Sequence, residues 1–408
     1  MNPRATPPAG RPALQALAAD RADASAGRSA PMGRARAALA LAAVLAAAPA
    51  FADINIGVVA SLTGPAASLG AETRKAVSLM PATLGGEKLN FILLDDATDP
   101  TAAVTDVRKL IGEHKVDAVL GPNLISNGNA IADVANQEKV PLVSVAPIDV
   151  SGDKRRYVFR AEPGADLMVR RIVEDMVAAG AKTVGFIGFS DSWGDTLFNA
   201  LKGAVETPGL RIVAAERYGR TDPSVQAQVL KLIAAKPDVI FVGGSGTPAA
   251  MPQITLRERG YKGAIYQSHG VTSREFLRVG GAKVEGALVP VGPVLVAEQL
   301  SDGHATKKAG TAFVKELEAK YGADTRSTFA GASWDAWLLL QNAFTVALKT
   351  AKPGSPAFRD AVRDALENTR GLVGSNGVYT TSPADHAGYD PKAIVLVKVE
   401  NGAWKLVK

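Results

Sequence analysis

The sequence contains no cysteine. A disulfide framework, a cysteine-ligated zinc site and a thiol nucleophile are therefore excluded. Histidine is also scarce, with only His114, His269, His304 and His386. No two of these histidines have the spacing of a metal-binding pair, and no HExxH-type motif occurs. We therefore expect no metal site, no cofactor and no catalytic residue of these classes.

Positive charge is scarce outside the N-terminal segment. The formal net charge is +6, but residues 1–52 contain six arginines and two aspartates, which leaves +2 for the rest of the chain. Aromatic residues make up 6% of the sequence, and no run of lysine or arginine is interleaved with them. Nucleic acid is therefore not an expected partner.

The N-terminal segment has the pattern of an export signal. Residues 33–52 read GRARAALALAAVLAAAPAFA, in which arginines precede an apolar run and a small-x-small sequence, Ala50-Phe51-Ala52. We interpret residues 1–52 as leader and signal peptide, with cleavage after Ala52 and a periplasmic location. The apolar run is short for a membrane span, so a retained anchor is the less favoured alternative. Both Met1 and Met32 remain candidate starts.

From Asp53 the sequence alternates strand-like apolar runs with helix-like periodic segments, including helices predicted over residues 71–80 and 222–235. The predicted strands cover residues 54–59, 89–96, 117–121, 140–147, 157–160, 183–189, 211–218, 238–244, 264–268 and 285–291. This alternation predicts an α/β fold with two doubly wound, Rossmann-like lobes, each built on a parallel sheet.

The pattern changes after Pro293. Three helices are predicted, followed by three strand-like pieces that suggest an antiparallel finish. The helices cover 307–321, 329–351 and 356–367, and the strand-like pieces cover 377–380, 393–399 and 403–408. A chain that returns in this way crosses between its lobes more than once.

Two enzyme patterns are incomplete. Residues 244–249, GSGTPA, match the glycine-rich dinucleotide fingerprint, but the following strand, AIYQSHG, lacks the acidic residue that would bind the ribose. A tight loop that lets the backbone approach another ligand is favoured. No GxSxG motif accompanies His269, so a ligand hydrogen bond or a role in loop structure is favoured over general-base catalysis. An exported α/β hydrolase or dehydrogenase remains the alternative from a different class.

Two segments carry polar or aromatic groups at strand-to-helix junctions. Ser126-Asn127-Gly128-Asn129 combines a hydroxyl, amides and a helix N-terminus, which suits a carboxylate ligand. Helix N-capping is an equally good interpretation of this segment. Trp193 follows an Asp-Ser turn at a helix start, where it could cover a ligand or pack between lobes.

An ordered series of motifs carries a family resemblance: SLTGPAASLG, DDATDP, GPNLISN, VPLVSVAP, FRAEPGAD, DSWG and the tail GAWKLVK. With these motifs the chain resembles the type I periplasmic substrate-binding proteins of branched-chain amino acid (leucine/isoleucine/valine-type) ABC transporters, over essentially all of residues 53–408. The resemblance implies two lobes joined by a three-crossing hinge that close around a ligand. It divides the chain into an N-terminal lobe, 53–165 and 294–375, and a C-terminal lobe, 166–293 and 376–408. It also implies a monomer that delivers its ligand to membrane permease subunits.

The resemblance places ligand contacts on six loops. Ser126 corresponds to the serine that holds the ligand carboxylate, and Trp193 to the usual aromatic of the second lobe. The complete implied set is Ser68, Leu69, Ser126, Asn127, Ala146, Ile148, Trp193, Gly246, Thr247, His269 and Gly270.

Two of these positions depart from the family pattern. His269 replaces the glutamate that pairs with an amino acid's ammonium group, and Ile148 replaces a hydroxyl residue. An unpaired buried ammonium would cost several kcal/mol, and Asp166 corresponds to a position nearer the hinge. The sequence therefore predicts a small aromatic or aliphatic carboxylate as ligand, with branched-chain amino acids as the alternative.

Overall fold

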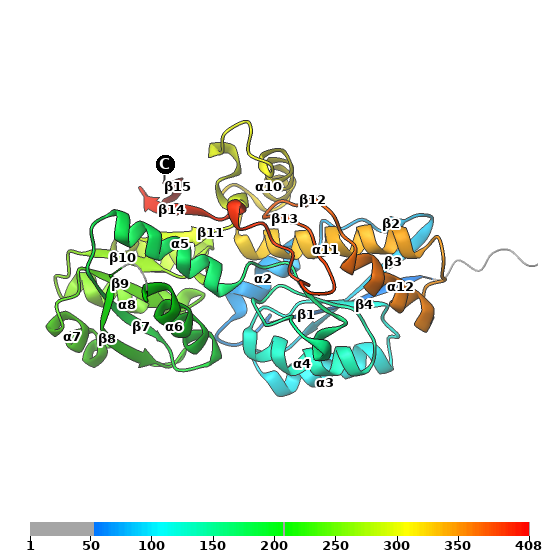
Figure 1. The fold of residues 1–408 in the computed structure, drawn as a ribbon, viewed down its shortest axis with the longest axis horizontal. Coiled ribbons are helices and arrows are strands. Elements are labelled where there is room, and N and C mark those ends of the chain that lie inside the picture. The colour runs from blue at the N-terminus through cyan, green and yellow to red at the C-terminus, as the bar shows by residue number, and fades with distance from the viewer. Residues whose placement is uncertain (1–52, 207–208, 408) are drawn as a thin grey trace, which may run out of the picture. The chain divides into compact units, whose positions relative to one another are not determined.

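The computed structural model describes residues 53–206 and 209–407. The predicted leader, signal peptide and cleavage site in residues 1–52 lie outside these described residues. Beginning at Ile54, the chain forms a six-stranded sheet, a seven-stranded sheet and a small two-stranded one (Figure 1). Within the described ranges, no helix combines the length and the apolar character needed to cross a membrane.

The first sheet has the strand order β2-β3-β1-β4-β5-β6. All of its neighbouring strands are parallel except β2, which forms an antiparallel edge with β3. Its strands are β1 (Ile54–Ala60), β2 (Thr83–Leu84), β3 (Glu87–Asp95), β4 (Ala118–Leu120), β5 (Leu142–Ser144) and β6 (Val158–Arg160).

The second sheet has the order β15-β14-β11-β10-β9-β7-β8, and its last two strands in sequence are antiparallel to their neighbours. Its strands are β7 (Thr183–Phe189), β8 (Arg211–Tyr218), β9 (Val239–Gly243), β10 (Ala264–Gln267), β11 (Leu288–Val291), β14 (Val395–Glu400) and β15 (Ala403–Leu406). The two-stranded sheet pairs β12 (Leu372–Val373) with β13 (Val378–Tyr379). Two parallel-dominated sheets with intervening helices confirm the predicted α/β fold class.

Helices cover both sheets. They are α2 (Ala67–Val77), α3 (Pro100–Gly112), α4 (Ile125–Gln137), α5 (Ala165–Ala178), α6 (Ser192–Val205), α7 (Gln226–Ala234), α8 (Ala250–Glu258), α9 (Arg274–Gly280), α10 (Lys307–Tyr321), α11 (Thr328–Ala347) and α12 (Pro356–Glu367). Helices α11 and α12, coloured orange in Figure 1, pack on each other and α11 packs on β4 and β5. We call the first sheet with α2, α3, α4, α11 and α12 the first lobe, and the second sheet with α5 to α9 the second lobe.

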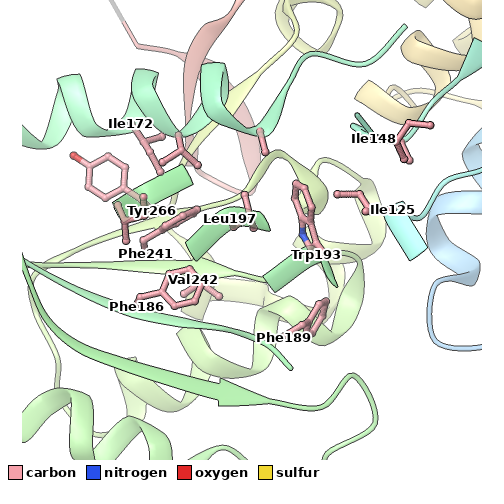
Figure 2. Packing of buried hydrophobic residues seen from close by; sticks show 14 of the residues in the cluster. Ile125, Ile148, Ile172, Phe186, Phe189, Trp193, Leu197, Phe241, Val242 and Tyr266 are labelled. Atoms are coloured by element: carbon pink, nitrogen blue, oxygen red, sulfur yellow. The ribbon is translucent and has the colours of Figure 1, made fainter. Parts of the chain in front are cut away.

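The strands that form the sheet centres are buried on both faces, which explains their continuous apolar sequences. In the first lobe, Trp337, Phe344 and Phe358 pack beneath α11 and α12. In the second lobe, Phe186 and Phe241 meet edge to face, and Figure 2 shows them on neighbouring strands. Apolar side chains thus pack on both sheets, and one apolar cluster continues from the first lobe into the second.

The structure corrects the first predicted helix. Helix α2 begins at Ala67 and ends at Val77, whereas the sequence predicted a helix over 71–80. The turn at Gly64 leads into the helix without a break, because Ala67 N donates a hydrogen bond to Gly64 O. Gly70 lies inside the helix, where a Cβ would be 2.1 Å from Ser61 O, so this glycine permits the close packing of α2 against Ser61.

Other boundaries also differ. Helix α7 begins at Gln226 rather than at 222, because the Asp222 side chain closes a turn by accepting from Gly219 N. The predicted helices 307–321 and 356–367 are confirmed as α10 and α12. Strands β14 and β15 confirm the antiparallel finish, but β13 pairs with β12 instead of joining the second sheet.

Candidate functional site

Loops from the carboxyl ends of strands in both lobes meet at one cavity. In the open α/β sheets of such folds, ligands bind at this end of the strands. The free space is only about 20 Å³, so its walls are nearly in contact. The lining residues are Leu69, Asn123, Leu124, Ile125, Val145, Pro147, Trp193, Ser245, His269, Gly270 and Phe329.

A larger cavity continues from the first one. It shares Ile125 and Pro147 with the inner cavity, has a volume of about 420 Å³, and extends to the connection between β6 and α5. Ile148 and Asp166 line this outer cavity and not the inner one. Ile148 is almost fully buried and packs closely on Gly128 of α4. A Cβ added to Gly128 would lie only 2.6 Å from Ile148 Cγ2.

Trp193 forms one wall of the inner cavity. It is the second residue of α6, whose start is capped by Asp191, because the Asp191 carboxylate accepts from Trp193 N and Gly194 N. The indole Nε1 donates to Gly244 O at 3.1 Å, which satisfies its only polar atom. Figure 2 shows the indole between Leu197 of its own helix and Ile125 of the first lobe. Trp193 therefore both lines the cavity and packs across the lobes.

The N-terminus of α4 forms the opposite wall. Asn123, Leu124 and Ile125 line the cavity, and the first backbone N–H groups of a helix have no partner within the helix. The N-cap residue is Leu124, which makes no side-chain capping bond. Ser126 and Asn127 therefore do not cap α4: the Ser126 hydroxyl donates to Asn127 Oδ1 at 3.0 Å. Neither of these two side chains lines the inner cavity.

Two predicted loops touch across the cleft. Gly246 adopts φ +62° and ψ −162°, a conformation that only glycine adopts readily. A Cβ on Gly246 would lie 2.9 Å from Ser68 Oγ and 3.0 Å from Leu69 Cδ1, so the second lobe closes directly against α2. The buried Ser68 hydroxyl has no hydrogen-bond partner among the described residues.

The remaining predicted residues lie at the margin. Both backbone groups of Ala146 are occupied, since its N–H donates to Ser144 Oγ and its carbonyl accepts from Ser144 and Ile148. Thr247 begins a short 3-10 helix after Gly246 and is half-buried outside the lining. Of the predicted set, the structure thus brings Leu69, Trp193, His269 and Gly270 together at the inner cavity. Ligand contacts by any of the set stay predictions.

A buried carboxyl group lies behind His269. Glu162 Oε1 is 3.2 Å from His269 Nε2, and their side chains are 2% and 4% exposed, respectively. Burial raises the pKa of Glu162 to about 8 and lowers the pKa of His269 to about 3. Burial therefore favours the uncharged form of each group, and a carboxyl group lies beside the imidazole.

Sequence reasoning missed Glu162. The residue belongs to the FRAEPGAD motif, directly after β6, but an acid that follows a strand is usually solvent-exposed or caps a helix. Its contact with His269 joins residues more than a hundred positions apart, and no local pattern indicates it. The one available clue was an acidic residue at the end of a buried strand.

Metal binding finds no support in the described part of the chain, where no three side chains of histidine, aspartate or glutamate gather into a set that could hold an ion.

The comparisons with known proteins identify the family. Residues 53–403 match the model of the family described as "Periplasmic binding protein". The chain belongs to this family.

Several relatives of this periplasmic binding protein have been characterised or solved. An extracellular ligand-binding receptor from Rhodopseudomonas palustris HaA2 is 44% identical, with a TM-score of 0.85 over 88% of this chain and 100% of that one. A Leu/Ile/Val-binding protein homolog 3 from Brucella melitensis is 28% identical over 59% of this chain and 68% of its own length. An ABC-transporter solute-binding protein from R. palustris, solved in complex with benzoate, is 19% identical with a TM-score of 0.75, over 87% of this chain and 96% of that one.

The relatives of this periplasmic binding protein are substrate-binding receptors and not enzymes. The alternative of an exported hydrolase or dehydrogenase is therefore excluded. The inner cavity between the two lobes is the candidate binding site.

Proposed function

We propose that this periplasmic binding protein is the receptor of an ABC importer, in which the two lobes close on a small aromatic or aliphatic carboxylate. It would act as a monomer in the periplasm after cleavage behind Ala52, and pass its ligand to membrane permease subunits. The lobes would comprise residues 53–165 with 294–375, and 166–293 with 376–408.

One observation carries the choice of ligand: among the described residues, no acidic side chain lines the inner cavity, whereas residues at the start of α4 do. An ammonium group would lose its hydration there without gaining an ionised partner, at a cost of several kcal/mol. A carboxylate would instead accept hydrogen bonds from the helix N-terminus. Leu69, Trp193 and Phe329 would surround its apolar part.

Branched-chain amino acids are the second candidate, favoured by the name of the Brucella relative, a Leu/Ile/Val-binding protein homolog. The benzoate complex shares the fold at 19% identity, which shows the fold alone. The choice between the two ligand classes therefore rests on the residues that line the cavity.

Thermal-shift and calorimetric titration of the purified protein with benzoate, short aliphatic acids and leucine tests this proposal. A ligand at 100 times its dissociation constant adds about 2.7 kcal/mol of apparent stability. Stabilisation by benzoate or another acid, with none by leucine, is expected. Tight leucine binding without any response to the acids would refute the proposed ligand class.

A pair of tryptophan variants ties the binding to the cavity. Trp193→Ala removes a cavity wall, whereas Trp404→Ala removes a similarly buried indole from β15. Both substitutions should destabilise the fold by about 3–5 kcal/mol. Only Trp193→Ala should abolish ligand binding at temperatures where both variants are folded.

A further inference from the structure

The buried Glu162–His269 pair has two polar atoms that nothing in the described protein uses. Glu162 Oε1 contacts His269 Nε2 at 3.2 Å, but Glu162 Oε2 and His269 Nδ1 are buried without a hydrogen-bond partner among the described residues. Leaving such groups unpaired costs about 1–3 kcal/mol each in general. His269 lines the inner cavity, whereas Glu162 does not, so His269 is the member of the pair on the cavity side, and Nδ1 is its unpartnered ring nitrogen.

We propose that Glu162 and His269 share one proton, and that this shared proton makes His269 Nδ1 a hydrogen-bond donor to an oxygen of the bound ligand. The inference rests on the proposed function, because it assigns a contact to a ligand in the same cavity. It specifies a ligand that presents a carboxylate or carbonyl oxygen, and no ammonium group, towards His269.

The chemistry follows from the 3.2 Å contact. With the proton on Glu162 Oε1, the carboxylic acid donates to Nε2, and the neutral imidazole carries its hydrogen on Nδ1. A ligand carboxylate that accepts from Nδ1 favours transfer of the shared proton to Nε2, which places an imidazolium between two carboxylates. The transfer moves one proton within the pair and requires no exchange with solvent.

Loss of the shared proton reverses the polarity of the site. The remaining N–H then lies on Nε2 and donates to the Glu162 carboxylate, so Nδ1 presents a lone pair and the pair carries a net charge of −1. An anionic ligand then meets both repulsion and the loss of a donor. Binding such a ligand above the pKa of Glu162, about 8, therefore requires uptake of one proton from solvent.

The charged and titratable groups around the Glu162–His269 pair do not change charge in the pH range in which the pair does. Arg160, Asp335, Tyr379 and Tyr389 act electrostatically on Glu162 or are influenced by it. Burial raises the pKa of Asp335 to about 6 and raises the pKa of both tyrosines above their usual value. Burial lowers the pKa of the Arg160 guanidinium, but the ordinary pKa of an arginine lies far above this range.

His269 itself is flanked by rings that do not titrate. The Trp193 ring meets its ring edge-on at 5.2 Å between centroids, and the Phe329 ring lies at 6.4 Å. Among the described neighbours, the Glu162–His269 pair is thus the group that changes charge between about pH 7 and pH 9.5.

Two measurements on the whole protein test the inference. Calorimetric titration with sodium benzoate from about pH 6.5 to about pH 9.5 should show affinity falling about tenfold per pH unit above the transition. Buffers with different ionisation enthalpies should report proton uptake rising from near zero to near one. In Glu162→Gln, which cannot ionise, both profiles should be flat, whereas Glu275→Gln, a control on α9 whose side chain is 46% exposed, should behave as the wild type.

A second measurement needs no ligand. Nitrogen-15 spectra of labelled histidine distinguish the Nδ1–H from the Nε2–H tautomer, and the His269→Asn variant assigns the signals. His269 should carry Nδ1–H at about pH 6.5 and Nε2–H at about pH 9.5, and this change should be absent in Glu162→Gln.

The two measurements separate the inference from the proposed function. If benzoate binds with unchanged affinity across this range while His269 keeps one tautomer, the shared proton is refuted and the carboxylate receptor stands. If neither benzoate nor another acid binds, but His269 changes tautomer only when Glu162 is present, the proton-sharing pair stands and the proposed ligand class fails.

Discussion

A disulfide across the cleft would test the closed arrangement of the lobes. The hydroxyl of Thr272, which follows β10 in the second lobe, hydrogen-bonds to that of Thr328 at the start of α11 in the first lobe. Both residues are buried, and the wild-type sequence contains no cysteine. In Thr272→Cys/Thr328→Cys the introduced thiols should therefore oxidise to a single, unambiguous disulfide that holds the lobes together.

The expected stabilisation follows from the loop that the bond closes. The two positions are 56 residues apart, and a loop of this length corresponds to about 4 kcal/mol of lost chain entropy in the unfolded state. Denaturant unfolding of the oxidised and reduced protein measures this difference directly. The oxidised form should also neither take up nor release ligand, and reduction should restore exchange.

Controls and the refuting result are simple for a chain without other thiols. Thr272→Cys alone should keep one reactive thiol in denaturant and gain no stability on oxidation. Thiol titration of the unfolded double variant should show two thiols after reduction and none after oxidation. If the double variant stays reduced in an oxidising buffer while folded, the lobes are not held in the arrangement described here.

Three further predictions concern the cleft and its supports. Gly246→Ala adds a methyl group 2.9 Å from Ser68 Oγ and should weaken ligand binding about tenfold in calorimetry. Gly322→Ala is the control, because the backbone at Gly322 also needs glycine (φ +93°, ψ 165°), but its Cβ would meet nothing within 4 Å. This control should keep wild-type affinity. Asp191→Ala removes the cap of α6 and should lower the free energy of unfolding by about 1–2 kcal/mol in urea. Because the pKa of Glu162 is raised, the contribution of its protonated form to stability is fully present below about pH 4.5 and is lost as the pH rises towards about 8. Relative to the wild type, Glu162→Gln should therefore gain about 1.4 kcal/mol in the free energy of unfolding per pH unit across this window. Denaturant unfolding at several pH values measures this difference. A constant difference would contradict this assignment.

The sheets were predictable because each depends on local pattern. Uninterrupted apolar runs such as that of β7 identify buried parallel strands, and short loops between them leave few alternatives. The boundaries of α2 were harder to predict from the sequence. Glycine disfavours helices by propensity, but Gly70 is required inside α2 because the Ser61 carbonyl oxygen approaches its backbone closely. Tertiary contact overrides propensity at such positions.

The site was predictable only in part, for the same reason. Trp193 and His269 lie directly after strands β7 and β10, so their position near the cleft follows from topology. Glu162 has a similar position after β6, but its contact with His269 depends on how two lobes meet, which no local pattern encodes. Position 269 carries no acid, but the Glu162 carboxyl group lies beside His269, and burial raises the pKa of this carboxyl group to about 8.

Both lobes are completed by the last third of the chain. Helix α11 supplies Trp337 and Phe344 to the core of the first lobe, and β14 pairs with β11 in the second. During synthesis from the N-terminus, neither lobe can therefore reach its native core until almost the whole polypeptide has emerged. The nascent chain must remain without a complete hydrophobic core for most of its synthesis. The edge of β11 also stays unpaired until β14, which begins at Val395, has been synthesised. Truncation before β14 would consequently yield a protein prone to aggregation rather than a smaller folded receptor.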